Sequence, residues 1–402
     1  MRRWLLHGLI PVLLLSALVF RTAHAGVINN VLIEWRAQVD KCEDPTKRDI
    51  DALVNVAMFD AINAIAHKYK PYALKTSAIP GSSMDAAAAK AAHDVLIVAC
   101  PDMASGYDGA LKASLALIAD TVARNNGAAI GKQAAAAVIA ARVNSKTDGN
   151  DPFMSSSKVG VYVPTLREVG MGFAHQHPWV MTKPDELRPP PPPALSSAVW
   201  ARDLNEIKSL GGKKSKTRTA AQTDDGKFWG NSDVRRVLRQ LIGLPGRSLV
   251  DDARFLALAE MAWVDTYVSM MDGKYAYNFW RPVTAIRGAA SDGNDSTTAD
   301  AEWEPLLNTP PHPEYPCGHC MSAAAVGTVI NLEFGKRMPT IVIDSDSSML
   351  RRLTTAQEYI DDVGEARMLG GVHYRNSINV GKAMGVSIGT LAVHRFFNPA
   401  RK

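Results

Sequence analysis

After residue 25 the sequence lacks any apolar run of the roughly 20 residues that a membrane-spanning helix needs. It also lacks an excess of either charge. Three of the 45 basic residues lie within the first 25, and the 42 that remain face 40 acidic residues. Such a balance excludes a general affinity for nucleic acid or for an anionic membrane surface. Convincing β-strand alternation is missing too, and the apolar stretch 340–343 is too short to count as a strand.

Cysteine is scarce, and the four that occur are Cys42, Cys100, Cys317 and Cys320. An even number in an exported protein favours disulfides, and the simplest of three pairings joins Cys317 to Cys320 and Cys42 to Cys100. The sequence Cys-Gly-His-Cys also has the spacing of thiol–disulfide oxidoreductases, but those need a βαβ context that this chain lacks. A zinc site is disfavoured because Cys42 and Cys100 have no partner at ligand spacing.

The first 25 residues have the pattern of a secretory signal. Arg2 and Arg3 precede an apolar stretch, residues 4–20, and residues 23–25 read Ala-His-Ala, which is typical of a cleavage site. The apolar stretch is short for a spanning helix. We therefore expect an exported protein, periplasmic or secreted, with no membrane span after the signal.

Helical patterns dominate the remainder. Residues 49–69 place apolar side chains close to helical spacing, and residues 86–99, 110–123 and 128–143 are rich in alanine. The polar junction 124–127 predicts a break. Helical patterning returns at about residue 196 and continues to 397, with loops near 211–217, 288–315 and 336–346. The fold class predicted is all-α, with two packed helical bundles.

A segment of different character, residues 144–195, separates the two helical regions. It ends in five consecutive prolines, residues 189–193, which predict an extended connector over the surface; a ligand for a proline-binding module is the alternative. We predict a signal peptide at 1–25, an N-terminal helical region at 26–143, a Pro-rich crossover at 144–195 and a C-terminal helical bundle at 196–402.

Three cationic clusters in the C-terminal half carry the chemistry. Lys274 and Arg281 are seven residues apart, two helical turns if the helix continues, so both could reach one anion. Pro-Cys-Gly-His at 316–319 precedes a helical pattern, which puts Gly318 at a helix N-terminus, where free amides favour an anion. His319 suits acid–base work. In the third cluster Arg367 is followed by His373 across two glycines.

In order, spacing and type these clusters resemble KxxxxxxRP, PSGH and SRxxxxxHxxxD, the signature of vanadium-dependent haloperoxidases and type 2 phosphatidic-acid phosphatases. The chain looks like the soluble bacterial branch similar to vanadium chloroperoxidases. This resemblance implies vanadate as cofactor, and hydrogen peroxide and a halide as substrates. It implies that vanadate oxygens are held by Lys274, Arg281, Cys317, Gly318 and Arg367, and that His373 binds vanadium.

The resemblance further implies that Lys274 and His373 act in catalysis and that His319 is the acid–base group for peroxide binding. His312 stands where algal bromoperoxidases have histidine, which makes it a halide-site candidate and favours bromide or iodide over chloride. Four positions depart from the pattern, and these are Met271, Cys317, Ala366 and Ser377. Ser377 replaces an aspartate, which puts the orientation of the His373 imidazole in question.

Two further functions stay open. The same cluster could hold a phosphate ester, with His373 as nucleophile and His319 protonating the leaving oxygen, which would make the protein an exported acid phosphatase. An anion-binding protein without activity is the other. The missing aspartate at position 377 favours the haloperoxidase over the phosphatase, because a nucleophilic histidine would depend on it more.

Overall fold

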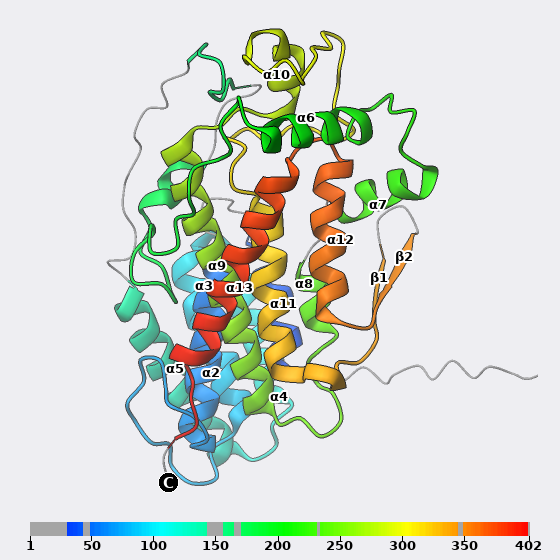
Figure 1. Ribbon diagram of the computed structural model, residues 1–402. Coiled ribbons are helices and arrows are strands. Elements are labelled where there is room, and N and C mark those ends of the chain that lie inside the picture. Colours follow the sequence, from blue (N-terminus) through cyan, green and yellow to red (C-terminus); the bar gives the residue numbers. More distant parts are fainter. Residues whose placement is uncertain are drawn as a thin grey trace, which may run out of the picture.

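The computed structural model describes residues 30–42, 49–142, 156–164, 170–230, 234–344 and 349–400. Helices make up nearly all of the regular structure in these residues, as Figure 1 shows. The expected signal peptide lies outside the described residues. Within them, no helix is long and apolar enough to span a membrane.

An N-terminal bundle forms from the first five α-helices, which are α1 Val31–Val39, α2 Ile50–Ala66, α3 Met84–Ala99, α4 Ala104–Ala116 and α5 Thr121–Arg142. The 3-10 helix η1 (Pro101–Met103) links α3 to α4. α3 packs against both α2 and α5, and its alanine face allows close contact. A disulfide between Cys42 and Cys100 joins the end of α1 to the end of α3, which confirms this predicted pairing.

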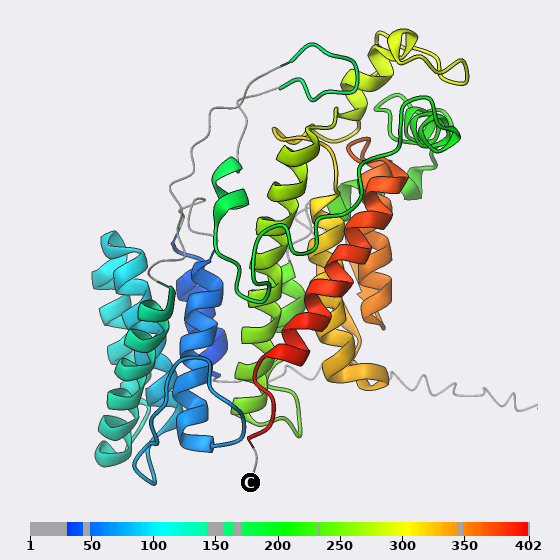
Figure 2. The same ribbon diagram turned by 60° about the vertical axis from the view of Figure 1, so that its left-hand side comes forward.

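The C-terminal bundle consists of α9 Leu249–Tyr277, α11 Gly318–Phe334, α12 Ala356–Leu369 and α13 Arg375–Arg395. Shorter elements surround it: α6 Ala198–Leu210, α7 Ala220–Gly230, α8 Val234–Arg239 and α10 Pro282–Arg287, with the 3-10 helices η3 Met171–His175, η4 Ala289–Ser291 and η5 Gly335–Arg337. Figure 2 shows α9 between the two groups, and α2 packs on it from the N-terminal side. The predicted all-α fold of two packed bundles is confirmed.

α9 is the central helix, and it is buried on nearly every face. Most of its 29 residues are buried, as expected for a helix that packs on both bundles. Ser248 caps its start by accepting a hydrogen bond from the Asp251 amide. It ends at Asn278, which adopts the left-handed conformation (φ 47°).

α13 approaches α11 through three glycines spaced four residues apart, Gly381, Gly385 and Gly389. A Cβ at each of these positions would lie within 2.4 Å of a backbone carbonyl oxygen of residues 317–325. The two backbones can therefore pack more closely than side chains would allow. This contact fixes the start of α11 beside the start of α13, where the candidate site lies.

Three sequence expectations were wrong. The junction 124–127 lies inside α5, because Gly127 fits against the carbonyl of Ser83 on α3; the chain breaks instead at 117–120, where Asp120 accepts the amides of two following residues. Helicity does not continue from Lys274 to Arg281, since α9 ends at Tyr277.

The third correction concerns the stretch 340–343, most of which does form a strand. β1 Ile341–Asp344 pairs antiparallel with β2 Leu350–Leu353, with Ile341 opposite Leu353. The second strand has no apolar alternation, and burial of Ile341 and Leu353 stabilises the pair instead. Tertiary packing thus determines the strand conformation of a segment whose own sequence pattern was too short to predict it.

The proline run lies across the end of α9. The hydroxyls of Tyr277 and Tyr315 donate to the carbonyls of Pro189 and Pro190, and Arg188 forms an ion pair with Asp272. These contacts hold the run to the protein, as predicted for a connector.

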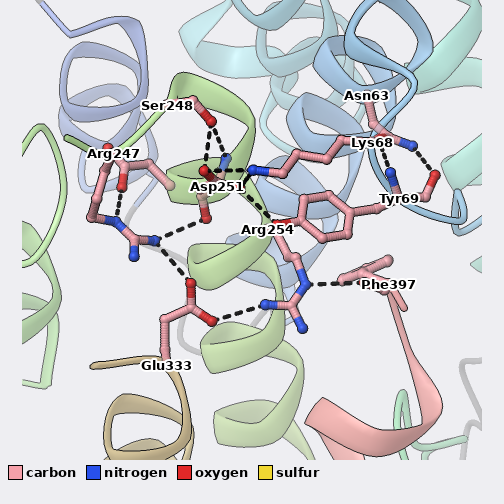
Figure 3. A network of polar contacts seen from close by, with 10 residues as sticks. Asn63, Lys68, Tyr69, Arg247, Ser248, Asp251, Arg254, Glu333 and Phe397 are labelled. Carbon is pink, nitrogen blue, oxygen red and sulfur yellow. Dashed lines mark hydrogen bonds and ion pairs between the residues drawn. The ribbon is translucent and has the colours of Figure 1, made fainter. Parts of the chain in front are cut away.

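A polar network links the start of α9 to three distant segments (Figure 3). Asp251 accepts hydrogen bonds from Lys68 Nζ, Tyr69 Oη and Ser248 Oγ, each at 2.7 Å. Glu333 on α11 pairs with two arginines of the α9 region, and one of these also donates to the carbonyl of Phe397. Burial acts to raise the pKa of Asp251, but these hydrogen bonds lower it to about 2.

Gly385→Ala should lower the free energy of unfolding by about 1–3 kcal/mol, because the added Cβ would lie 2.2 Å from the carbonyl oxygen of Met321. Gly109→Ala in α4 is the matched control. Nothing lies within 4 Å of its Cβ position, so alanine should stabilise the helix by up to about 1 kcal/mol. Urea unfolding of both variants measures the two effects, and shifts of the same sign would contradict the packing described for α13.

Asp251→Asn should lower the free energy of unfolding by about 1–2 kcal/mol at pH 7. A carboxylate whose pKa falls on folding stabilises the protein above its unfolded pKa, and this contribution disappears as the pH falls toward 2. The difference between wild type and variant should therefore stay constant above about pH 5 and shrink below pH 4. Asp102→Asn, at an exposed position, is the control for denaturation from pH 2 to 7. A difference that is independent of pH would contradict the assignment.

Candidate functional site

Lys274 lies fully buried in the last turn of α9. Its Nζ donates to the carbonyl oxygens of Pro313 (2.9 Å), Glu314 (2.7 Å) and Pro316 (2.7 Å). Three carbonyl acceptors require three N–H bonds, which only the ammonium form has. Lys274 therefore brings a positive charge into the site and fixes the loop before α11, while its own donors are occupied.

Arg281 is also fully buried and precedes Pro282, the first residue of α10. Its guanidinium donates from Nε to the carbonyl of His312, from Nη1 to the carbonyl of Val372 and from Nη2 to His312 Nδ1, each at 2.9 Å. Nη1 also lies 3.3 Å from His373 Nε2. Because guanidinium only donates, His312 accepts at Nδ1 and holds its proton on Nε2. One side chain thus holds residues from two separate loops.

Arg367 lies in the last turn of α12 and is 3% exposed. Nη1 donates to the carbonyl of Gly230 at 2.8 Å, whereas its buried Nε has no partner among the described residues. The chain then turns at Gly371 (φ 75°), where a Cβ would lie 2.4 Å from the carbonyl oxygen of Gly211. The amide of His373 donates back to the Arg367 carbonyl, so this turn fixes the start of the histidine loop.

His373 is buried and held by a carboxylate. Its Nδ1 lies 2.8 Å from Glu314 Oε1, which also accepts the amide of Tyr374 at 3.1 Å. Burial lowers the pKa of His373 well below its ordinary value, and the charges of Arg281 and Lys274 lower it further. The imidazole is therefore neutral, with the proton on Nδ1 directed at Glu314 and the lone pair on Nε2.

The N-terminus of α11 completes the site. Cys317 is its N-cap and forms a disulfide with Cys320, which confirms the second predicted pairing. The sulfur accepts the Cys320 amide and cannot donate. The Gly318 amide has no partner among the described residues, and a Cβ there would lie 1.9 Å from Met270 Sδ. His319 lies in the first turn with an exposed side chain.

The site holds more positive than negative charge. Burial lowers the pKa of Lys274 well below its usual value, that of Arg281 to about 10 and that of Arg367 to about 9, and repulsion by neighbouring cations adds to the effect for Lys274 and Arg367. Burial raises the pKa of Glu314 to about 7, although Lys274 and Arg281 oppose this. Since arginine keeps its proton in proteins, the lowered pKa values express the cost of burying these cations, which a bound anion would relieve.

The structure thus brings together Lys274, Arg281, His312, Gly318, Arg367 and His373, and places His319 at the exposed side of the same helix start. Met271 packs toward Gly170 instead, and its neighbour Met270 is the methionine that reaches Gly318. Ala366 is buried in the core.

The sequence patterns assigned no role to Glu314. One signal could have found it: the chain lacks a carboxylate at position 377, and Glu314 is an acidic residue within the Pro-rich loop before α11.

Residues 254–401 match the family model of the VCPO second helical-bundle domain. A vanadium chloroperoxidase from Curvularia inaequalis is 27% identical to this chain over 118 residues, which make up 27% of this chain and 19% of that enzyme. The match therefore spans about a fifth of the fungal enzyme.

Two solved structures extend the likeness beyond residues 254–401. A bacterial vanadium-dependent iodoperoxidase matches 92% of this chain and 97% of its own, with a TM-score of 0.76 and 21% identity. A holo-type bacterial vanadium-dependent chloroperoxidase matches 90% and 96%, with a TM-score of 0.71 and 17% identity. These matches show that nearly the whole chain shares the fold of these proteins.

The residues of the candidate site fit an oxyanion such as vanadate on three counts. Three buried cations face one carboxylate, the Nε of Arg367 and the amide of Gly318 are without partners among the described residues, and a neutral imidazole presents Nε2 beside Arg281. A tetrahedral anion would offset the charge and accept these donors.

Inorganic phosphate should raise the melting temperature of the protein, by the equivalent of about 2.7 kcal/mol at a concentration 100-fold above Kd. Arg367→Met should remove most of this response. Its melting temperature without phosphate should be no lower than that of wild type, because a repelled buried cation is replaced by an apolar chain. Differential scanning calorimetry with and without phosphate measures both the response to phosphate and the melting temperature of the variant. Arg239→Met, at a half-exposed site on α8, is the control and should respond to phosphate as wild type does. Equal responses in all three proteins would place the anion elsewhere.

Proposed function

We propose that this protein is a vanadate-dependent haloperoxidase that oxidises bromide or iodide with hydrogen peroxide. The observation that carries the proposal is the buried excess of positive charge around a neutral, carboxylate-held His373. One carboxylate, Glu314, cannot neutralise three buried cations, so the site calls for a bound anion, and the imidazole lone pair provides a ligand for its central atom. The family match of residues 254–401 supports the same assignment.

In this scheme Arg281, Arg367 and the Gly318 amide would hold vanadate oxygens, Lys274 would contribute its charge, and His373 would bind vanadium through Nε2. When bound, vanadate supplies Lewis acidity toward peroxide without changing its oxidation state. Cys317 cannot donate to an oxygen because its sulfur is in a disulfide. His319, exposed in the first turn of α11, would exchange protons between the site and solvent as peroxide binds.

Bromide or iodide is the proposed halide for two reasons. His312 lies within the site, and its Nε2–H is left free to donate because Arg281 occupies Nδ1. Such a donor favours a halide ion near the imidazole. An iodoperoxidase is also among the similar solved structures, which supports a halide that is easily oxidised.

We also propose export to the periplasm or outside the cell. The signal-like first 25 residues and the two disulfides support this, because disulfides persist in oxidising compartments.

A phosphomonoesterase is a second candidate, because one observation favours it. The missing carboxylate at position 377 disfavoured a nucleophilic histidine, yet Glu314 supplies a carboxylate to His373 Nδ1. His373 could then attack phosphorus through Nε2 while His319 protonates the leaving oxygen. A thiol–disulfide exchange role is disfavoured since both sulfurs of the Cys317–Cys320 pair are buried.

Purified protein should oxidise bromide or iodide with peroxide only after incubation with orthovanadate. His373→Ala should lower kcat/KM by more than about 100-fold, since losing a residue behind a metal ligand already costs up to that much. His394→Ala, on the exposed part of α13, is the control and should retain activity. Hydrolysis of a phosphate monoester that vanadate inhibits, without halide oxidation, would establish the phosphatase instead. If the protein shows neither activity, it is an anion-binding protein without catalysis.

A further inference from the structure

The imidazole of His373 takes its orientation from a residue 59 positions earlier in the chain. His373 Nδ1 and the amide of Tyr374 both donate to Glu314 Oε1, at 2.8 and 3.1 Å. Both donors belong to the loop before α13, whereas the carboxylate belongs to the loop before α11. The carboxylate thus sets the ring tautomer and the position of the loop at once.

Glu314 is itself held at the backbone on both sides. Its amide donates to the carbonyl of Phe279 at 2.9 Å, and its carbonyl accepts from Lys274 Nζ at 2.7 Å. The residue is fully buried, so its side chain has little freedom. One residue therefore connects the lysine of the first cluster to the histidine of the third.

Ser377 lies one turn after His373, on the first turn of α13, and is 1% exposed. Its hydroxyl is close enough to the Glu314 carboxylate to lower the pKa of that carboxyl, but neither Glu314 Oε2 nor Ser377 Oγ makes a well-aligned hydrogen bond among the described residues. An aspartate at 377 would put a second carboxylate against Glu314, without solvent. Two buried like charges repel strongly, so carboxyl groups at both positions could not both be ionised.

We propose that Glu314 is the positioning residue of the candidate active site, holding His373 with Nδ1 protonated and Nε2 unprotonated beside Arg281, where the oxyanion would bind. In this chain the carboxylate comes from the loop before α11, and Ser377 leaves room for it on α13. The inference deepens the proposed function and rests on it for the role of Nε2, while the hydrogen bond itself exists without any ligand.

Histidine-labelled protein, free of vanadate, provides the first test. In ¹⁵N NMR spectra the resonance absent from His373→Ala should show a protonated Nδ1 and an unprotonated Nε2. Glu314→Ala should lose this signature and give a mixture of tautomers. Glu314→Gln keeps the shape of the side chain and one acceptor oxygen, so it should retain the tautomer of His373. It therefore keeps the test decisive if the alanine variant fails to fold.

The second test is a rescue, measured as phosphate affinity by calorimetry. Glu314→Ala should weaken phosphate binding by about 10–100-fold, as for loss of a residue behind a ligand. Ser377→Asp alone should also weaken it, because the new carboxylate faces Glu314. Together, Glu314→Ala and Ser377→Asp should bind more tightly than either single variant. Glu302→Ala, at an exposed position of the same loop, is the control.

A double variant that binds no better than Glu314→Ala, with all proteins folded by circular dichroism, would overturn the proposal. So would an unchanged His373 tautomer in Glu314→Ala. Both tests use unloaded protein and phosphate, so they do not depend on halide oxidation. Absence of halide oxidation with a positive rescue would reject the haloperoxidase and leave the role of Glu314 intact.

Discussion

The structure depends on keeping three positive charges away from water with a single carboxylate among them. Burying one unpaired cation costs several kcal/mol, and three close together also repel one another. The fold meets part of this cost with helix ends. Lys274 and Arg367 occupy the last turns of α9 and α12, where the helix dipole is negative, while α11 points its positive end toward the same place. The positive charge that remains unbalanced gives the site its affinity for an anion.

This arrangement holds the irregular loop before α11 through hydrogen bonds from two buried cations. The ammonium of Lys274 is bonded to three of its carbonyls, and Arg281 to the carbonyl and ring of His312. Charged donors give the stronger hydrogen bonds, so the cations stabilise the loop that presents Glu314 to His373. Exchange of Arg281 for lysine would keep the charge but lose the planar fork that reaches two loops.

How much could be predicted from the sequence depended on the range of the interactions. Helical periodicity and the helix N-terminus at Gly318 are local features, and the structure confirms them. The junction 124–127 failed because Gly127 has a tertiary partner on α3 that outweighs its poor helix propensity. Glu314 was missed because its contact with His373 crosses 59 residues, and no local pattern encodes it. The sequence shows that position 377 lacks an acidic residue, but it does not show that Glu314 takes over the contact with His373.

The Cys317–Cys320 disulfide is consistent with a site that binds its anion through charged side chains more than through neutral hydrogen-bond donors. A serine in place of Cys317 would add a hydroxyl donor for an oxyanion oxygen, whereas the bonded sulfur adds none and accepts the Cys320 amide. Anion binding at this site therefore relies on the cations and on the Gly318 amide. A free thiol beside peroxide would be oxidised step by step to acids, which would place a new negative charge among the cations. Because the sulfur is already in a disulfide, that route to losing the positive charge of the site is closed.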